Sequence, residues 1–318
     1  MAADQVIADQ IVSKPEGESS GIGPFTRFKY MIVRGFLWGW ARCFSLKGLY
    51  LFGQFFGTIE YLVNHKRRRR FRERFQETFG SHADQIRVPV GRLCRQHIMR
   101  TRCDKLFYLI FDKLPREKII NRLKFHNREF LDDVLKRGKG AYICMSHNGS
   151  HHVAVLLMAL SGYKVAGVRD PNEGTLRRYV QEKYEETFPE FRAIRMFYTD
   201  TYPRDLYRCF QEQYILGSAL DVNRLRGLHL KTAKVTIFGR EREFLIGPMQ
   251  IALRCKAPIL QGFVVSRKNF YFHLIGTPPL IDPDKAGDTP EILQTAMQHY
   301  ADNIAAHLLK YPDHISKA

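Results

Sequence analysis

The residues best suited to acid–base chemistry are the histidines that follow a short apolar run, Ala141–Met145. His147, His151 and His152 come directly after this run, and apolar residues return at helical spacing from Val153. The pattern predicts a strand, a polar turn and a helix, with His147 at the carboxyl edge of a sheet, where open α/β folds bind ligands. Because the unperturbed pKa of histidine lies near neutral pH, we expect His147 to act as a general base.

Two chemistries fit these histidines. In the first, His147 deprotonates an alcohol that attacks an acyl group; in the second, His147 and His151 form an i, i+4 pair of metal ligands. The metal hypothesis lacks a third ligand, because the sequence contains no H-E-x-x-H motif and no second histidine pair of that spacing. A metal-dependent His-box enzyme is therefore the less favoured alternative, and no residue is assigned as a metal ligand. A purely structural role for the histidines is the remaining alternative, and Asn148 is the amide expected to contact substrate.

Polar residues also end two other apolar runs. Arg169 and Asp170 follow one run, and Asp221 and Arg224 follow another. If these runs are neighbouring strands, the polar residues lie at the same edge as His147. Asp221 and Asp170 are then candidates to orient the imidazole, whereas Arg169 and Arg224 would bind a phosphate or polarise a carbonyl oxygen. The alternative is that they are turn residues that only end strands.

The elements that must position these residues alternate along the chain. Helical patterns lie between several short apolar runs, which are Ala141–Met145, Val165–Val168, Leu216–Val222, Val235–Phe238, Pro258–Val265 and Phe270–Ile275. This alternation predicts an α/β fold, with a mixed sheet flanked by helices. Residues 84–137 are predicted to be helical, and Thr289–Leu309 has the pattern of a closing amphipathic helix. We expect one domain over residues 25–318.

The N-terminal part differs in character. Residues 1–24 are polar and are predicted to be a disordered tail. Residues 25–63 are rich in Phe, Tyr and Trp, but their longest uncharged run, Gly48–Ile59, is too short to span a bilayer. The basic run His65–Arg74 follows directly. Residues 25–80 are therefore predicted to be membrane-interface helices with a basic run; the alternative is a helix pair packed on the protein's own core.

The formal net charge of +18 implies an anionic partner. No P-loop and no dinucleotide-binding glycine motif occurs in the sequence. The basic run lies beside aromatic residues and not in a recognisable nucleic-acid reading module. We therefore expect an anionic membrane surface as the partner, and no nucleic acid.

The order of these motifs along the chain resembles that of the lipid A late acyltransferases (lauroyl/myristoyl acyltransferases) of the wider lysophospholipid acyltransferase group. The resemblance covers roughly residues 30–312 and lies more in layout than in identity. The family's G-x-G turn corresponds to Gly138-Lys139-Gly140, its H-x4-E box to His147 to His152, and its R-P pair to Arg169 with Pro171. Its D-Q pair corresponds to Asp221 and its F-F-G segment to Phe238-Gly239. Its A-P-V strand corresponds to Ala257-Pro258-Ile259, and its final proline to Tyr311-Pro312.

The resemblance implies a reaction and a location. Such enzymes transfer a fatty acyl group from acyl carrier protein or coenzyme A to a hydroxyl of a glycolipid or lysophospholipid, as in late acylation of lipid A for lipopolysaccharide. They need no bound cofactor beyond that acyl thioester. By the same resemblance, the protein would lie on the cytoplasmic face of the inner membrane, peripheral or monotopic, with His147 as the general base.

The chain departs from the family pattern where the box should end in an acid, because position 152 is His. An imidazole does not stabilise an imidazolium at His147 as a carboxylate does. Three outcomes are open: Asp170 or Asp221 orients His147, the chemistry differs, or the protein is a catalytically inactive lipid-binding relative.

Overall fold

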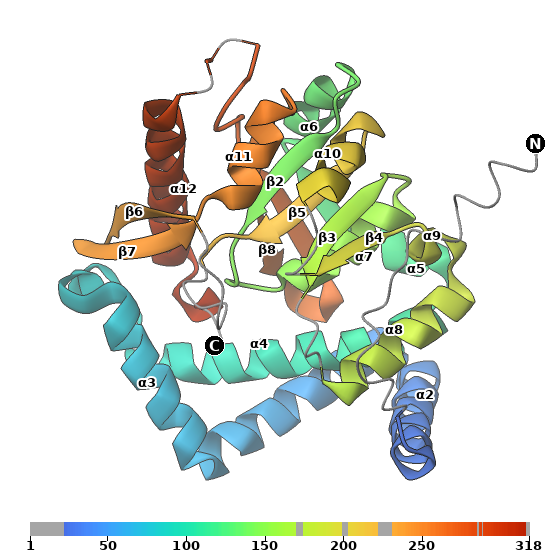
Figure 1. Cartoon of the computed structure of the whole chain (residues 1–318). Coiled ribbons are helices and arrows are strands. Elements are labelled where there is room, and N and C mark those ends of the chain that lie inside the picture. Colours follow the sequence, from blue (N-terminus) through green and yellow to red (C-terminus); the bar gives the residue numbers. More distant parts are fainter. Residues whose placement is uncertain are drawn as a thin grey trace, which may run out of the picture.

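The computed structural model describes residues 22–169, 174–198, 203–221, 231–284, 286–287 and 289–315. Seven strands form one sheet in the order β1-β9-β8-β2-β5-β3-β4 (Figure 1). β8 and β9 are antiparallel and the other neighbouring pairs are parallel, so the sheet is mixed. The strands are β1 (Leu123–His126), β2 (Ala141–Met145), β3 (Val165–Arg169), β4 (Arg195–Tyr198), β5 (Ile215–Ala219), β8 (Ile259–Ser266) and β9 (Phe272–Gly276).

The central strand β2 shows why helices cover both faces of the sheet. All of its residues are buried, and successive side chains of a strand point to opposite faces. Ile143 and Met145 therefore join one apolar core, and Tyr142 and Cys144 join the other. A parallel sheet buried on both faces is the usual α/β arrangement. The predicted α/β fold with a mixed sheet flanked by helices is confirmed.

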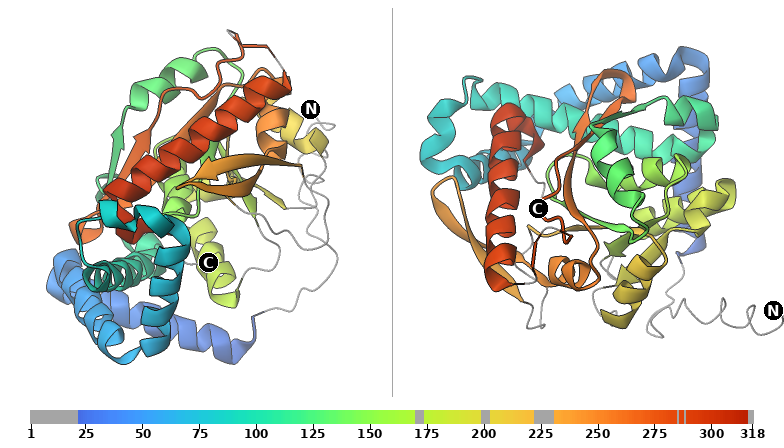
Figure 2. Two further views of the ribbon diagram at one scale, coloured as in Figure 1. Left: turned by 90° about the vertical axis from the view of Figure 1, so that its left-hand side faces the viewer. Right: turned by 90° about the horizontal axis from the view of Figure 1, so that it is seen from above.

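Helices of the two cores lie on opposite sides of the sheet. α7 (His151–Leu160) contributes to the first core, whereas α11 (Gly247–Arg254) and α12 (Pro290–Lys310) contribute to the second (Figure 2). The remaining helices around the sheet are α5 (Arg116–Ile120), α6 (Arg128–Leu135), α8 (Thr175–Thr187), α9 (Pro189–Arg192) and α10 (Pro203–Gln211). Short 3₁₀ turns are η1 (Gly80–Gln85), η2 (Phe111–Lys113), η3 (Lys268–Phe270) and η4 (Pro312–His314).

Three long helices gather at one end of the molecule (Figures 1 and 2). They are α2 (Pro24–Val63), α3 (His65–Phe79) and α4 (Val90–Ile110). α2 bends at Ser45, whose φ of 64° and ψ of 170° are not helical. Gly57 lets α2 approach α4 closely, because a Cβ there would lie 2.7 Å from the Cα of Met99. One side of α2 thus packs on the protein itself, and no helix of the described residues is long and apolar enough to cross a membrane.

The structure corrects the sequence expectation at three places. Residues 84–137 are not all helical, because Leu123–His126 form the edge strand β1, whose exposed Lys124 and His126 gave no strand-like apolar run. β4 was not predicted either. Predicted Val235–Phe238 is part of a two-stranded hairpin, β6 (Thr232–Ile237) and β7 (Arg240–Leu245), outside the main sheet. Of the predicted tail, residues 1–24, residues 1–21 lie outside the described part of the chain.

Candidate active site

The carboxyl ends of β2 and β5 bring His147 and Asp221 together. The two strands are parallel neighbours, with Met145 opposite Ala219. The chain leaves β2 through Ser146 to His147, and it leaves β5 through Leu220 to Asp221. Nδ1 of His147 lies 2.8 Å from Oδ1 of Asp221. The backbone N–H of His147 donates to both carboxylate oxygens, at 3.0 and 2.9 Å, so Asp221 fixes the loop as well as the ring.

This contact shifts the pKa of His147 and sets the tautomer of its neutral ring. The hydrogen bond to Asp221 raises the pKa of His147, against an opposing effect of burial and of the Arg177 cation. Because the carboxylate accepts a hydrogen bond at Nδ1, the neutral ring carries its proton there and leaves Nε2 free to accept one. The His147 side chain is 43% exposed, whereas that of Asp221 is 12% exposed. A substrate can therefore reach the base but not the carboxylate behind it.

The loop after His147 is held by the backbone of two other segments. Gly149 has a φ of +72°, and a Cβ there would lie 2.4 Å from the carbonyl oxygen of Val264. Its N–H donates to the carbonyl of His314 at 2.9 Å. On the strand side, the Tyr300 hydroxyl donates to the carbonyl of Met145 at 2.6 Å. The loop therefore has little room to shift.

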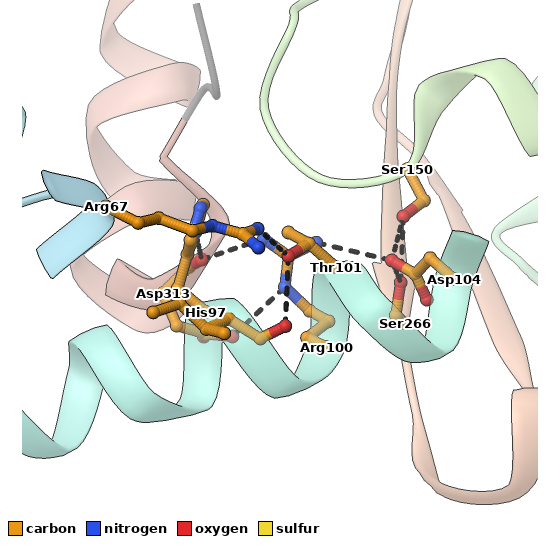
Figure 3. A network of polar contacts seen from close by, with 9 residues as sticks. Arg67, His97, Arg100, Thr101, Asp104, Ser150, Ser266 and Asp313 are labelled. Carbon is orange, nitrogen blue, oxygen red and sulfur yellow. Dashed lines mark hydrogen bonds and ion pairs between the residues drawn. The ribbon is translucent and has the colours of Figure 1, made fainter. Parts of the chain in front are cut away.

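A buried polar network supports the same loop from α4 (Figure 3). Ser150 precedes α7, but its hydroxyl does not cap that helix and donates instead to Oδ2 of Asp104. Ser266 donates to the same oxygen at 2.8 Å. Arg100 lies 3.4 Å from this carboxylate and 3.2 Å from that of Asp313. The network thus ties α4 and the C-terminal turn to the loop that carries His147.

The other two histidines of the motif do not take the place of the acid. The ring of His151 meets that of His147 edge-on, with centroids 5.2 Å apart. The ring of His152 packs against Tyr108 and His151, at 5.5 and 5.7 Å. Among the residues that the structure describes, no group of three or more His, Cys, Asp or Glu side chains could hold a metal ion.

The remaining predicted site residues are placed as follows. Asn148 is 9% exposed, and its amide donates to the Ser146 hydroxyl at 3.2 Å, so it faces inward. The backbone of Arg169 ends β3, which neighbours β5, and thus lies at the same edge as His147. Asp170 and Arg224 lie outside the described residues.

Sequence reasoning missed Asp104, Ser150 and Ser266. The one signal for Asp104 was an acidic residue close in sequence to the apolar residues Cys103, Leu106 and Phe107. An acid in such a place needs buried partners. Which partners it finds depends on tertiary contacts 46 and 162 residues away.

Most of the chain matches a known protein family. The sequence pattern of a family described as bacterial lipid A biosynthesis acyltransferase matches residues 25–312. No curated protein matches the chain. The matched segment includes the sheet, the His147 loop, the three N-terminal helices and the closing helix α12. The chain therefore belongs to the bacterial lipid A biosynthesis acyltransferase family.

Proposed function

We propose that the protein transfers a fatty acyl group from an acyl thioester to a hydroxyl of a glycolipid or lysophospholipid, as in late lipid A acylation. The observation that carries this proposal is the His147–Asp221 pair at the carboxyl edge of the sheet. Family membership supports an acyltransferase. The donor would be acyl carrier protein or coenzyme A, and the acceptor a lipid.

In this proposal, Nε2 of His147 removes the proton from the acceptor hydroxyl as its oxygen attacks the thioester carbonyl. The imidazolium that forms is stabilised by Asp221 through Nδ1. The tetrahedral intermediate then expels the thiolate, which takes up the proton that the His147 imidazolium releases. Arg169 and Arg224 are proposed to bind the negative charge of the substrate. Because the thioester is already activated, a positioned base is sufficient to accelerate the reaction, by a factor of roughly 10²–10⁴. Asp221 here takes the role of the acid that is absent at position 152.

The test is acyl transfer by the His147→Ala variant. Activity is measured with a labelled acyl-carrier-protein or acyl-coenzyme A donor and either a lipid A precursor or a lysophospholipid in detergent micelles. We expect a loss of roughly 10²–10⁴-fold in kcat. His299→Ala, at an exposed position on α12, is the matched control and should keep full activity. If His147→Ala retained activity within threefold of wild type, the protein would have to be regarded as a lipid-binding relative or as an enzyme of other chemistry.

We also propose that α2 attaches the protein to the cytoplasmic face of the inner membrane. Fourteen of the fifteen exposed large apolar side chains among the described residues belong to this helix, including Phe25 at 80% and Phe55 at 61% exposure. Exposed patches of this kind mark interaction sites. Phe28→Ser/Ile32→Ser should weaken flotation with neutral vesicles, whereas Leu309→Ser, at the one exposed large apolar residue outside α2 in the described part of the chain, should not. Equal flotation of all three proteins would remove the attachment proposal.

A further inference from the structure

The basic run at the start of α3 does not form one uniform surface. Arg67 turns inward, where it pairs with Glu60 and donates to the Thr101 hydroxyl at 2.6 Å (Figure 3). Arg68 donates to the carbonyl of Leu62 at 2.6 Å and to that of Tyr61. These two arginines hold the corner between α2 and α3. The guanidinium groups of Arg67 and Arg68 are therefore engaged in contacts within the protein.

Three other cations of the run line a cleft. α3, α4 and the C-terminal segment enclose a space of about 580 Å³, which is within the size range of ligand sites. Lys66, Arg70 and Arg74 lie along it, each one helical turn from the next. Lys66 and Arg70 are exposed and make no ion pair within the part of the chain that the structure describes.

Two acids also line this cleft, but they leave an excess of positive charge. Glu73 lies 3.4 Å from Arg69, which is outside the cleft lining, and Glu77 is the second acid. Against them stand four cations, Lys66, Arg67, Arg70 and Arg74, of which Arg67 and Arg74 also have contacts within the protein. Guanidinium and ammonium groups that converge on one space bind phosphate oxygens well, because several charge-assisted hydrogen bonds form at once.

The surroundings of the cleft indicate which phosphate it takes. Leu62 and Val63, at the end of α2, are 61% and 68% exposed, and Asn64, the next residue, lines the cleft. A lipid whose headgroup reached Lys66 and Arg70 would leave its acyl chains beside these exposed apolar side chains. A soluble phosphate compound would make no use of them.

We propose that the cleft between α3, α4 and the C-terminal segment binds the phosphate of a lipid headgroup through Lys66, Arg70 and Arg74. The proposal rests on the membrane attachment proposed for α2 and adds a specific site to it. It is independent of acyl transfer. Neither His147 nor Asp221 is among the residues that line the cleft.

The experiment compares two double variants of the full-length protein that lose the same charge. Lys66→Gln/Arg70→Gln removes cations from the cleft. Arg72→Gln/Arg92→Gln removes exposed cations of α3 and α4 that do not line it. Flotation is measured with phosphatidylcholine vesicles alone, with vesicles containing phosphatidic acid, and with vesicles containing phosphatidylglycerol at matched surface charge. Circular dichroism and the thermal midpoint of unfolding confirm that each variant folds. If a double variant does not fold, the single variant Arg70→Gln replaces the cleft variant and the single variant Arg72→Gln replaces the control.

We expect the cleft variant to lose about tenfold in affinity for phosphatidic acid vesicles, and the control variant to lose less than threefold. Binding to phosphatidylcholine alone, which reports α2 attachment, should be equal in all three proteins. Equal losses in both variants would mean diffuse charge attraction and would overturn the site. If only binding of glycerol phosphate in solution fell in the cleft variant, the site would belong to a soluble phosphate compound and the lipid assignment would be wrong. If the wild-type protein did not bind vesicles of phosphatidylcholine alone, that result would contradict the proposed attachment through α2 and not the cleft.

Discussion

At the scale of single residues, the partner of His147 comes from another strand and not from its own motif. Asp221 lies 74 residues further along the chain, and the parallel register of β2 and β5 brings the two side chains together. Reasoning from strand ends could include Asp221 among the candidates, because polar residues that follow neighbouring parallel strands share one edge. It could not choose between Asp170 and Asp221, since that choice depends on which strand lies next to β2.

Replacing Asp221 by Asn tests this pairing. The carboxylate raises the pKa of His147, so its loss should move the acidic limb of the kcat profile to lower pH. A general base works as the neutral imidazole, and a lower pKa keeps it neutral at lower pH while making it a weaker base. We expect kcat on the plateau to fall roughly 10²–10⁴-fold, because the amide neither stabilises the imidazolium nor enforces the same tautomer.

Kinetics over pH 5–9 measure both effects. Asp302→Asn, an exposed change on α12 with the same chemistry, is the control and should leave the profile as it is. A profile for Asp221→Asn that kept its acidic limb in place would show that the limb does not report His147.

At the scale of elements, periodicity predicts those that bury a full face. The apolar run Ala141–Met145 has the same bounds as β2, and Thr289–Leu309 differs from α12 by one residue at each end. β1 and β4 lie at the two edges of the sheet and have only four residues each. Their short, partly polar sequences satisfy no strand pattern, because pairing with a neighbour, and not burial of both faces, holds them in the sheet.

The loop between β2 and α7 contains a position, Gly149, where the backbone conformation and the close packing favour glycine. Gly149→Ala should lower the free energy of unfolding by about 2 kcal/mol or more, since a side chain disfavours its positive φ and the new Cβ would meet the Val264 carbonyl. Urea denaturation measures the change. Gly35→Ala is the control: its Cβ would meet nothing within 4 Å in helix α2, so it should be neutral or slightly stabilising. A Gly149→Ala protein as stable as wild type would mean that the loop is not tightly held.

At the scale of the whole molecule, the C-terminus is the point where the helical end and the sheet meet. Asp313 accepts from His97 and Arg100 of α4, and the His314 carbonyl accepts from Gly149 of the active-site loop. His307 on α12 stacks on Phe263 of β8, with centroids 4.3 Å apart. Neither aromatic stacking nor these contacts could be predicted from the sequence, because they join residues more than forty positions apart.

Two buried histidines of this junction make stability depend on pH. Nε2 of His307 and both ring nitrogens of His314 are buried and find no hydrogen-bond partner among the described residues. Burial, together with the Arg100 and Lys310 cations, lowers the pKa of His307 from 6.5 to about 4, and burial also holds the pKa of His314 well below its ordinary value. The folded protein thus keeps both rings neutral at a pH where the unfolded chain takes up protons. Stability is complete above pH 6.5 and falls as the pH drops from there towards 4.

We expect His307 alone to contribute a loss on the order of 3 kcal/mol in the free energy of unfolding between these limits. His307→Phe preserves a flat ring against Phe263 but cannot be protonated, so its unfolding free energy should decline less between pH 6.5 and 4 than that of wild type. Denaturant unfolding at a series of pH values measures the difference. His299→Phe, at an exposed position on the same helix, should follow the wild-type decline. Parallel curves for wild type and His307→Phe would mean that the His307 ring takes up its proton in the folded protein as readily as in the unfolded chain.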